Sequence, residues 1–209
     1  MKPGMLWRAA LLLLMLVPAW AQAEPDGVVL RTQGTVTLDG EDGARALSRG
    51  DAVNRGAALR TGPGARAKIR MRDGTVLTLG ADTVFRVERY RTGRDGEKPP
   101  EGVFRLLEGV FRAVTGAITD KGGQILMKTR VATVGVRGTD FWGGFYFSEA
   151  LDVILLEGSG VFIRNGAGTV RLNRPKEMTT VRGPDRAPER PALIAPERLQ
   201  RAAGSVAFD

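Results

Sequence analysis

The most regular group of charged side chains in the sequence is a set of four cations at alternate positions of one short stretch. From residue 65 to residue 72, small or apolar residues occupy the odd positions and basic residues the even ones, which is typical of a β-strand with one cationic face. Neighbouring like charges about 7 Å apart repel modestly in water, and an anionic ligand would relieve that repulsion. A cross-strand acid such as Glu88, or simple solvation, would also relieve it, so both interpretations stay open. The four residues are Arg66, Lys68, Arg70 and Arg72.

An aromatic cluster at residues 141–147 is the second candidate site. If a strand continues through this cluster, Trp142 and Tyr146 share one face at a separation of about 13 Å. Such a pair would stack on sugar rings or on an aromatic partner, because both side chains combine apolar area with a polar tip. The alternative is that both faces of the strand are buried, as large aromatic residues usually are. The face opposite Trp142 would then carry Phe141, Phe145 and Phe147.

The motif Arg137-Gly138-Thr139 lies between this cluster and a run of β-branched residues. The run favours a half-buried strand with Ala132, Val134 and Val136 on one side, and Gly138 ends it. We expect a structural role for Arg137, whose five donors would tie backbone carbonyls at the end of the strand. Arg137→Ala would then unfold or aggregate the domain. The alternative is a cation that contacts a ligand.

Most familiar catalytic chemistry is excluded by composition, because the sequence contains no His and no Cys. Histidine acid–base catalysis, cysteine nucleophiles and zinc sites with His or Cys ligands are therefore ruled out. The acidic residues nearest the aromatic cluster are Glu149 and Asp152, and two acids near an aromatic strand are only a weak sign of a glycan hydrolase. We expect no catalytic residue, no metal and no cofactor, and a protein that is not an enzyme.

The spacing of apolar segments predicts an all-β fold of many short strands, arranged as a solenoid-like stack or as a two-sheet sandwich. The chain has 28 Gly and 11 Pro, and its apolar segments are separated by turn residues. One hairpin can be specified further. A three-residue loop, Arg72-Asp73-Gly74 with a left-handed Gly74, pairs Ile69 with Leu77 and keeps the apolar side continuous.

The two ends of the chain differ from its middle. Residues 1–23 carry Lys2 and Arg8, then a short apolar run, then small residues ending at Ala23, which is typical of a signal peptide cleaved after Ala23. The apolar run is far shorter than the ~20 residues that span a bilayer, so no transmembrane span is expected in the mature chain. Residues 24–182 are expected to form the domain. Residues 183–209 form a tail rich in Pro and Arg, with room for a short helix that begins at Pro196.

Two ordered blocks of sequence resemble the FecR-like domain family, the extracytoplasmic modules of iron-responsive regulators that act with a cytoplasmic sigma factor. The resemblance covers roughly residues 28–182. Arg130 stands where the family usually has Pro. The first block contains Gly50-Asp51, Thr61-Gly62, Asp73-Gly74-Thr75 and Leu77-Thr-Leu79-Gly80, and the second is Thr129-x-Val-Ala-x-Val-x-Val-Arg-Gly-Thr-x-Phe141.

The resemblance implies a non-enzymatic binding or sensing module in the periplasm, with a role in envelope or iron-responsive signalling. The alternative is an envelope scaffold protein that contacts an anionic glycan, lipid or outer-membrane partner. The formal net charge of +8 favours anionic neighbours. We expect an unknown protein or an anionic envelope component as the partner, and no nucleic acid, because export separates the chain from it.

Overall fold

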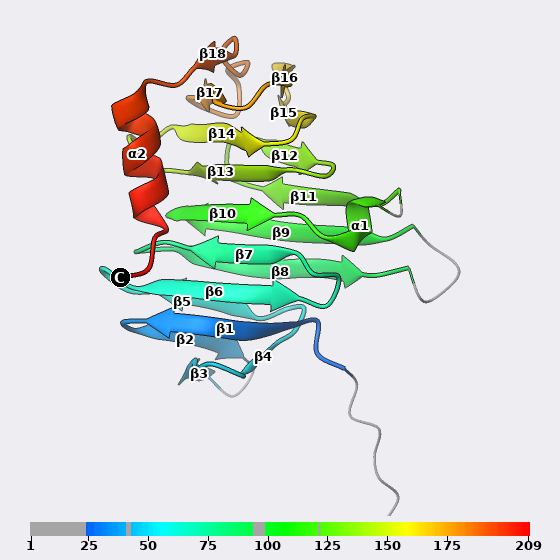
Figure 1. Ribbon diagram of the computed structural model, residues 1–209, viewed down its shortest axis with the longest axis vertical. Helices are drawn as coiled ribbons and strands as arrows, with labels where there is room; N and C mark the ends of the chain where they lie inside the picture. Colours follow the sequence, from blue (N-terminus) through cyan, green and yellow to red (C-terminus); the bar gives the residue numbers. More distant parts are fainter. Residues whose placement is uncertain (1–23, 41–42, 94–98, 121) are drawn as a thin grey trace, which may run out of the picture.

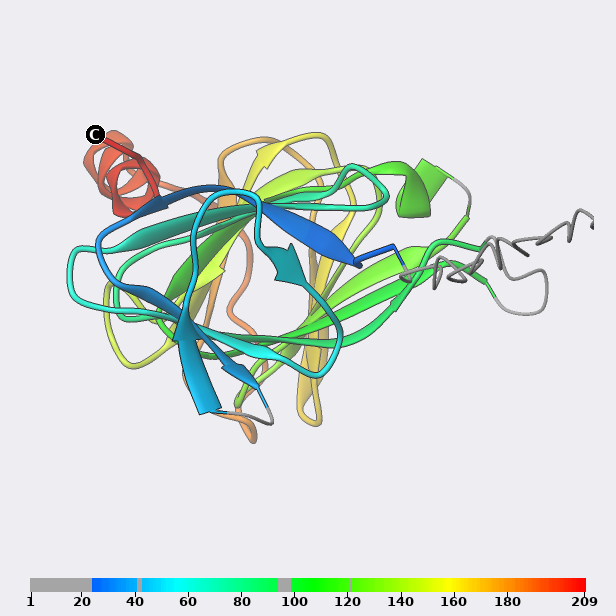
Figure 2. The same ribbon diagram turned by 90° about the horizontal axis from the view of Figure 1, so that it is seen from below.

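Two β-sheets packed face to face form the body of the protein (Figures 1 and 2). The computed structural model describes residues 24–40, 43–93, 99–120 and 122–209. Within these residues the chain passes repeatedly from one sheet to the other, and all strand pairs are antiparallel except β9 with β11. The all-β prediction is therefore confirmed, and of the two arrangements considered the protein adopts the sandwich.

Each sheet has nine strands in the described part of the chain. In spatial order, sheet A contains β18 (Ala192–Leu193), β17 (Glu177–Val181), β14 (Leu151–Glu157), β13 (Asp140–Gly144), β10 (Val110–Val114), β7 (Val76–Leu79), β6 (Arg66–Met71), β1 (Gly27–Gln33) and β4 (Ala52–Val53). Sheet B contains β16 (Gly168–Leu172), β15 (Val161–Asn165), β12 (Thr133–Val136), β11 (Gln124–Lys128), β9 (Glu101–Glu108), β8 (Val84–Arg91), β5 (Ala58–Thr61), β2 (Val36–Gly40) and β3 (Gly43–Ala46). The helices are α1 (Ala117–Asp120) and α2 (Pro196–Ser205).

The main hydrophobic core fills the space between the sheets. Alternate residues of each strand point into it, and it includes Ala132, Val134 and Val136, as the sequence predicts. Aromatic pairs from neighbouring strands add directional contacts, with ring centroids 5.7 Å apart for Phe85 and Phe104. Because most strands bury one face in this core, a binding site is to be sought on the outer faces of the two sheets.

The hairpin between β6 and β7 has the predicted register. Ile69 pairs with Leu77, and Gly74 at the end of the three-residue loop has φ 89°. The carboxylate of Asp73 ties this loop to the other sheet, because it accepts a hydrogen bond of 2.6 Å from the buried hydroxyl of Tyr90. Burial raises the pKa of Tyr90, and the bond to Asp73 raises it further. Asp73 is therefore a structural residue that joins the two layers.

Two turns bound strand β12 within the stretch from Thr129 to Thr139. The Thr129 hydroxyl accepts hydrogen bonds from the backbone N–H groups of Val131 and Ala132, at 3.2 and 3.1 Å, and so closes the turn before β12. After β12, Gly138 has φ 68° where the chain crosses to sheet A. Thr139 is buried, and its N–H donates to the Thr115 hydroxyl at 2.8 Å. These threonines and the glycine shape the crossing between sheets.

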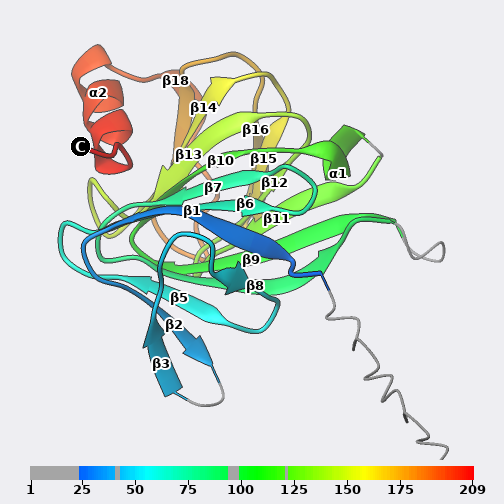
Figure 3. The same ribbon diagram turned by 60° about the horizontal axis from the view of Figure 1, so that its bottom comes forward.

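A second, smaller hydrophobic core lies outside the sandwich, between sheet A and α2. Trp142 is fully buried there, and its indole N–H donates to the Ser205 hydroxyl at 3.0 Å. The tail thus returns along the sheet, and Figures 1 and 3 show α2 crossing the ends of several strands of sheet A. Pro196 stands at the start of this helix, as expected, because a missing N–H costs nothing in the first turn.

The expectations for residues 1–23 lie outside the described residues. The connection at residues 94–98, between β8 and β9, lies outside them as well. Among the residues that are described, neither helix has the length and apolar character needed to cross a bilayer.

Candidate binding surface

The cationic strand predicted from sequence is β6 and its loop, on the outer face of sheet A. Lys68 and Arg70 have no acidic partner within the described residues, whereas Arg72 pairs with Asp26 at 3.4 Å. Glu88, proposed from sequence as a cross-strand acid for this face, lies on β8 of the other sheet. That proposal is wrong because the register of distant strands cannot be read from one sequence. Arg66 is half-buried and donates to the neighbouring Ala65 carbonyl.

The C-terminal residues lie at the edge of the same face. Arg31 on β1 is the direct neighbour of Lys68 on β6. Its guanidinium donates to the Asp209 carbonyl at 2.6 Å and lies 4.7 Å from the centroid of the Phe208 ring. The tail therefore covers one end of this cationic face, and α2 covers the strand ends beside it (Figure 1).

Trp142 and Tyr146 do not form an open platform. Strand β13 ends at Gly144, so the chain turns and brings the two rings to 6.2 Å between centroids instead of about 13 Å. Trp142 is buried beneath α2, and Tyr146 is 42 % exposed. Phe147 also packs on the Trp142 side, which corrects the expected grouping with Phe141. The buried alternative holds for Trp142.

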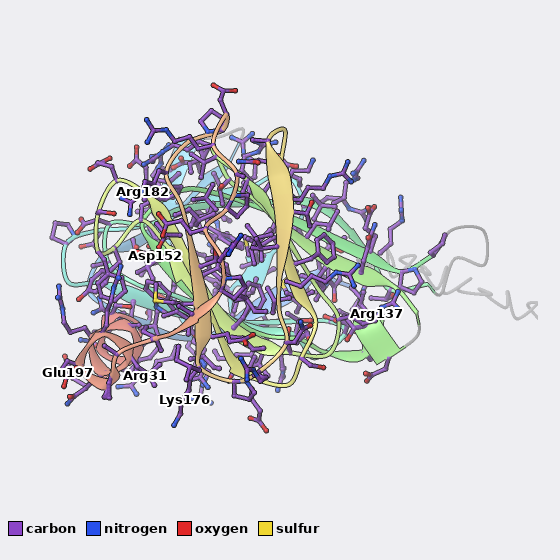
Figure 4. The ribbon with its side chains drawn as sticks, turned by 90° about the horizontal axis from the view of Figure 1, so that it is seen from above. Arg31, Arg137, Asp152, Lys176, Arg182 and Glu197 are labelled. Carbon is purple, nitrogen blue, oxygen red and sulfur yellow. The ribbon has the colours of Figure 1, made fainter. Side chains whose placement is uncertain are left out.

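Arg137 is exposed, so the prediction that it is buried against carbonyls is wrong. The chain leaves β12 at this residue and points it outward, at the end of the sandwich away from α2 (Figure 4). It lines a cavity of about 290 Å³ together with Arg91, Glu101 and Gln124. The backbone at this junction is held by Thr139 and Thr115 instead.

Glu149 and Asp152 have different surroundings and do not form a catalytic pair. The Glu149 side chain is fully exposed beside Arg130. Asp152 is fully buried, accepts a hydrogen bond of 2.5 Å from the Thr180 hydroxyl, and pairs with Arg198 of α2 at 3.1 Å. Burial raises the pKa of Asp152 although these two partners lower it. Asp152 therefore anchors the helix to the outer face of sheet A.

The outer face of sheet B carries a row of cations that crosses the strands. Arg86 on β8 lies opposite Arg105 on β9, and Arg105 lies beside Lys128 on β11. Lys128 pairs with Thr133 on β12, and Thr133 pairs with Arg164 on β15. Neighbouring strands lie about 4.8 Å apart, so the row extends roughly 19 Å from Arg86 to Arg164. Sequence reasoning missed this row because each strand contributes a single member, and only strand order aligns them.

Acidic residues neutralise part of this row. Glu88 binds both Arg105 and Lys128, and these hydrogen bonds outweigh the effect of burial and lower its pKa. Glu101 pairs with Arg91 at 3.0 Å and Arg89 at 3.5 Å. Three exposed cations of this face have no acidic partner among the described residues, and they are Arg86, Arg164 and Arg171.

An aromatic ring lies between two of the unpaired cations. Phe162 on β15 is opposite Arg171 on β16 and two residues from Arg164 on its own strand. Its ring leans over Gly135 of β12, where a Cβ atom would lie 1.8 Å from the ring. An open hollow of about 550 Å³ borders the ring and Arg164, with Leu126 and Thr133 in its wall. The structure thus brings a ring, a hollow and free cations together on one face.

One sequence feature points towards this group. The segment Gly160-Val-Phe-Ile-Arg164 repeats the pattern of Glu101-Gly-Val-Phe-Arg105 and Glu108-Gly-Val-Phe-Arg112. In the two earlier copies the Phe is buried in the main core, whereas Phe162 faces outward. The extra Ile163 shifts the alternation by one residue, so that Ile163 enters the core and both Phe162 and Arg164 point outward.

Comparison with known proteins supplies the family. Residues 57–159 match the FecR family, described as FecR protein. The chain carries a FecR-like domain. The matched segment runs from β5 past the end of β14, so this FecR-like domain includes strands of both sheets and ends shortly before Phe162. No curated protein matches the chain.

Two solved structures have a fold similar to that of this chain. Two crystal structures of a candidate anti-sigma factor from Parabacteroides distasonis, at 2.50 and 1.65 Å resolution, each align with a TM-score of 0.55 and 22% sequence identity. Each alignment covers 68% of this chain and 62% of that protein, so the chain matches less than two thirds of that protein's length. At this identity the likeness concerns the fold.

Proposed function

We propose that the protein is a non-enzymatic FecR-like binding or sensing module of the bacterial envelope, acting in the periplasm. The observation that carries this proposal is the family match across residues 57–159. FecR-like domains belong to regulatory systems, and the described residues contain no cluster of acids that would hold a metal. The open basic face of sheet B supplies a surface with which such a module would contact its partner.

Export is part of the proposal. Residues 1–23 have the pattern of a cleavable signal peptide, so the mature protein is expected to begin at Glu24 in the periplasm. Fractionation of cells followed by N-terminal sequencing tests this expectation. A protein that keeps Met1 and stays inside the inner membrane would overturn the assigned location.

Signalling is tested by deleting the gene and measuring transcription genome-wide. A sensing module predicts altered transcription of a defined operon, restored by complementation. Crosslinking in intact cells would capture the protein that receives the signal. Unchanged transcription would contradict sensing.

The second candidate function is an envelope scaffold, and the observation that favours it is the unpaired positive charge of the sheet B face. A scaffold predicts weakened envelope integrity after deletion, measured as sensitivity to detergent. Variants that remove Arg86, Arg164 and Arg171 together would reproduce that sensitivity. A deletion strain with normal detergent resistance would contradict the scaffold.

A further inference from the structure

We propose that the outer face of sheet B binds a linear glycan that carries carboxylates, with a sugar ring on Phe162 and acidic groups on Arg164 and Arg171. This inference rests on the proposed binding function, for which it names the class of ligand. It is carried by three features that meet at β12, β15 and β16.

Charge is the first feature. Arg164 and Arg171 are exposed and have no acidic partner within the described residues, and both border Phe162, Arg171 as its cross-strand neighbour on β16 and Arg164 two residues further along β15. A guanidinium presents a planar fork of donors that matches a carboxylate, and such a charge-assisted pair is stronger than a neutral hydrogen bond. The site therefore favours a ligand whose carboxylates lie next to an apolar centre.

The aromatic ring is the second feature. Phe162 is held over Gly135, where only a residue without a Cβ leaves room for it. Sugar rings have apolar C–H faces that stack on aromatic rings, while their carboxylates project from the ring edge. In a chain of uronic acids with one sugar ring on Phe162, the carboxylate of that unit and the carboxylate of the next unit would be available to the two arginines. This geometry explains why the face combines an aromatic ring with cations.

The open shape of the site is the third feature, and it separates the glycan from other anions. The hollow beside Phe162 is open, and the cationic row leads away from it across β12, β11, β9 and β8. A polymer would extend from Arg164 past Arg105 and Lys128, which Glu88 binds, to the unpaired Arg86, whereas a small molecule would not reach Arg86. The ligand is therefore a chain of sugars.

An acidic peptide fits less well, because extended peptides bind by adding a strand to a free sheet edge. Phe162, Arg164 and the hollow lie on the interior strands β12 and β15, whose backbone groups are already paired on both sides, and only Arg171 belongs to the edge strand β16. An anionic bilayer also fits less well. Phe162 is half-buried over Gly135 and does not protrude as a side chain inserted into a bilayer would.

Isothermal titration calorimetry of the purified full chain tests the proposal. The probes are oligogalacturonate as the carboxylated glycan, dextran as the neutral glycan, polyglutamate as the acidic peptide, and vesicles of phosphatidylglycerol. We expect oligogalacturonate to bind more tightly than polyglutamate of equal charge, and no binding of dextran. Equal or tighter binding of polyglutamate or of the vesicles would overturn the proposal, and so would failure of oligogalacturonate to bind.

Variants locate the site. Arg164→Gln is expected to weaken oligogalacturonate binding about tenfold, the loss of one charge-assisted contact. Phe162→Ala is expected to weaken it roughly three- to tenfold while leaving polyglutamate binding unchanged. Gly135→Ala would displace the ring and is expected to weaken glycan binding with both arginines intact. The matched control is Arg70→Gln on sheet A, for which no change is expected.

The binding experiments and the gene deletion together distinguish a failure of this proposal from a failure of the function on which it rests. If Arg70→Gln weakens binding as much as Arg164→Gln, the glycan site is not on sheet B and the inference fails. If oligogalacturonate does not bind but gene deletion still alters a defined operon, the ligand class alone is wrong and the sensing function stands.

Discussion

The outer faces of the two sheets differ in what covers them. Sheet A buries Trp142 and Asp152 beneath α2, which contributes a second hydrophobic core and an ion pair. Among the described residues no helix covers the outer face of sheet B, where cations and Phe162 are exposed or half-buried. The outer face of sheet A therefore contributes to stability, and the outer face of sheet B remains available for contact with a partner. Polar and apolar residues alternate in both sheets.

The sharpest test of this comparison is the removal of one aromatic side chain from each face. Trp142→Ala is expected to lower the free energy of unfolding by about 3–5 kcal/mol, because it leaves a cavity beneath α2. Phe162→Ala is expected to lower it by about 1 kcal/mol or less, since the ring is only half-buried. Urea unfolding measures both. Equal losses would show that sheet B also depends on its outer face for stability.

The second test concerns the ion pair between Asp152 and Arg198 of α2, whose removal should cause a loss of stability that depends on pH. Arg198→Ala is expected to lower the free energy of unfolding by roughly 2 kcal/mol at pH 8, since Arg198 is partly exposed while Asp152 is buried. Burial raises the pKa of Asp152, so the folded state holds its proton at higher pH than the unfolded state does. Stability therefore falls as pH rises from the unfolded pKa of about 4 through the folded pKa.

Without its cation, Asp152 should protonate at still higher pH, so the fall in stability extends further. The difference between Arg198→Ala and the parent protein should be small near pH 4 and largest near pH 8, as measured by urea midpoints at several pH values. Arg201→Ala is the control, because Arg201 lies over the same Phe147 ring as Arg198 but does not pair with Asp152. A loss for Arg198→Ala that is independent of pH would contradict the role of the ion pair.

The smallest expected effect concerns the repulsion on sheet B. Arg86 stands directly opposite Arg105, and like charges in that position destabilise a sheet. Arg86→Glu should therefore raise the free energy of unfolding by about 0.5 kcal/mol at low salt, and the gain should disappear near 1 M NaCl. Arg60→Glu is the opposite control, because it breaks the pair with Asp39 at 2.6 Å. Destabilisation by Arg86→Glu would mean that Arg86 has a structural role on this face.

Local pattern was sufficient for the parts of the fold that depend on neighbouring residues. The alternation of residues 65–79 and the position of Gly74 predict the β6–β7 register that the structure has. The same alternation fails beyond Gly144, because β13 ends there and the chain turns. The predicted spacing of Trp142 and Tyr146 was wrong for that reason.

The candidate site could not be predicted from the local sequence pattern. Arg137 was expected to be a buried arginine that ties backbone carbonyls at the end of its strand, yet it is exposed. Glu88 was assigned to the wrong sheet, and the row from Arg86 to Arg164 was not recognised. These positions are set by strand order, and strands far apart in sequence become neighbours through the packing of the whole domain.

The sequence by itself determined the all-β class, the absence of His and Cys chemistry, the turn at Gly74 and the end of a strand at Gly138, because propensity and side-chain alternation act over a few residues. Only the tertiary structure decided that α2 covers sheet A and leaves sheet B open. The physical reason is that burying Trp142 and pairing Asp152 with Arg198 requires residues some 46 to 63 positions apart to meet. No local rule encodes such a meeting.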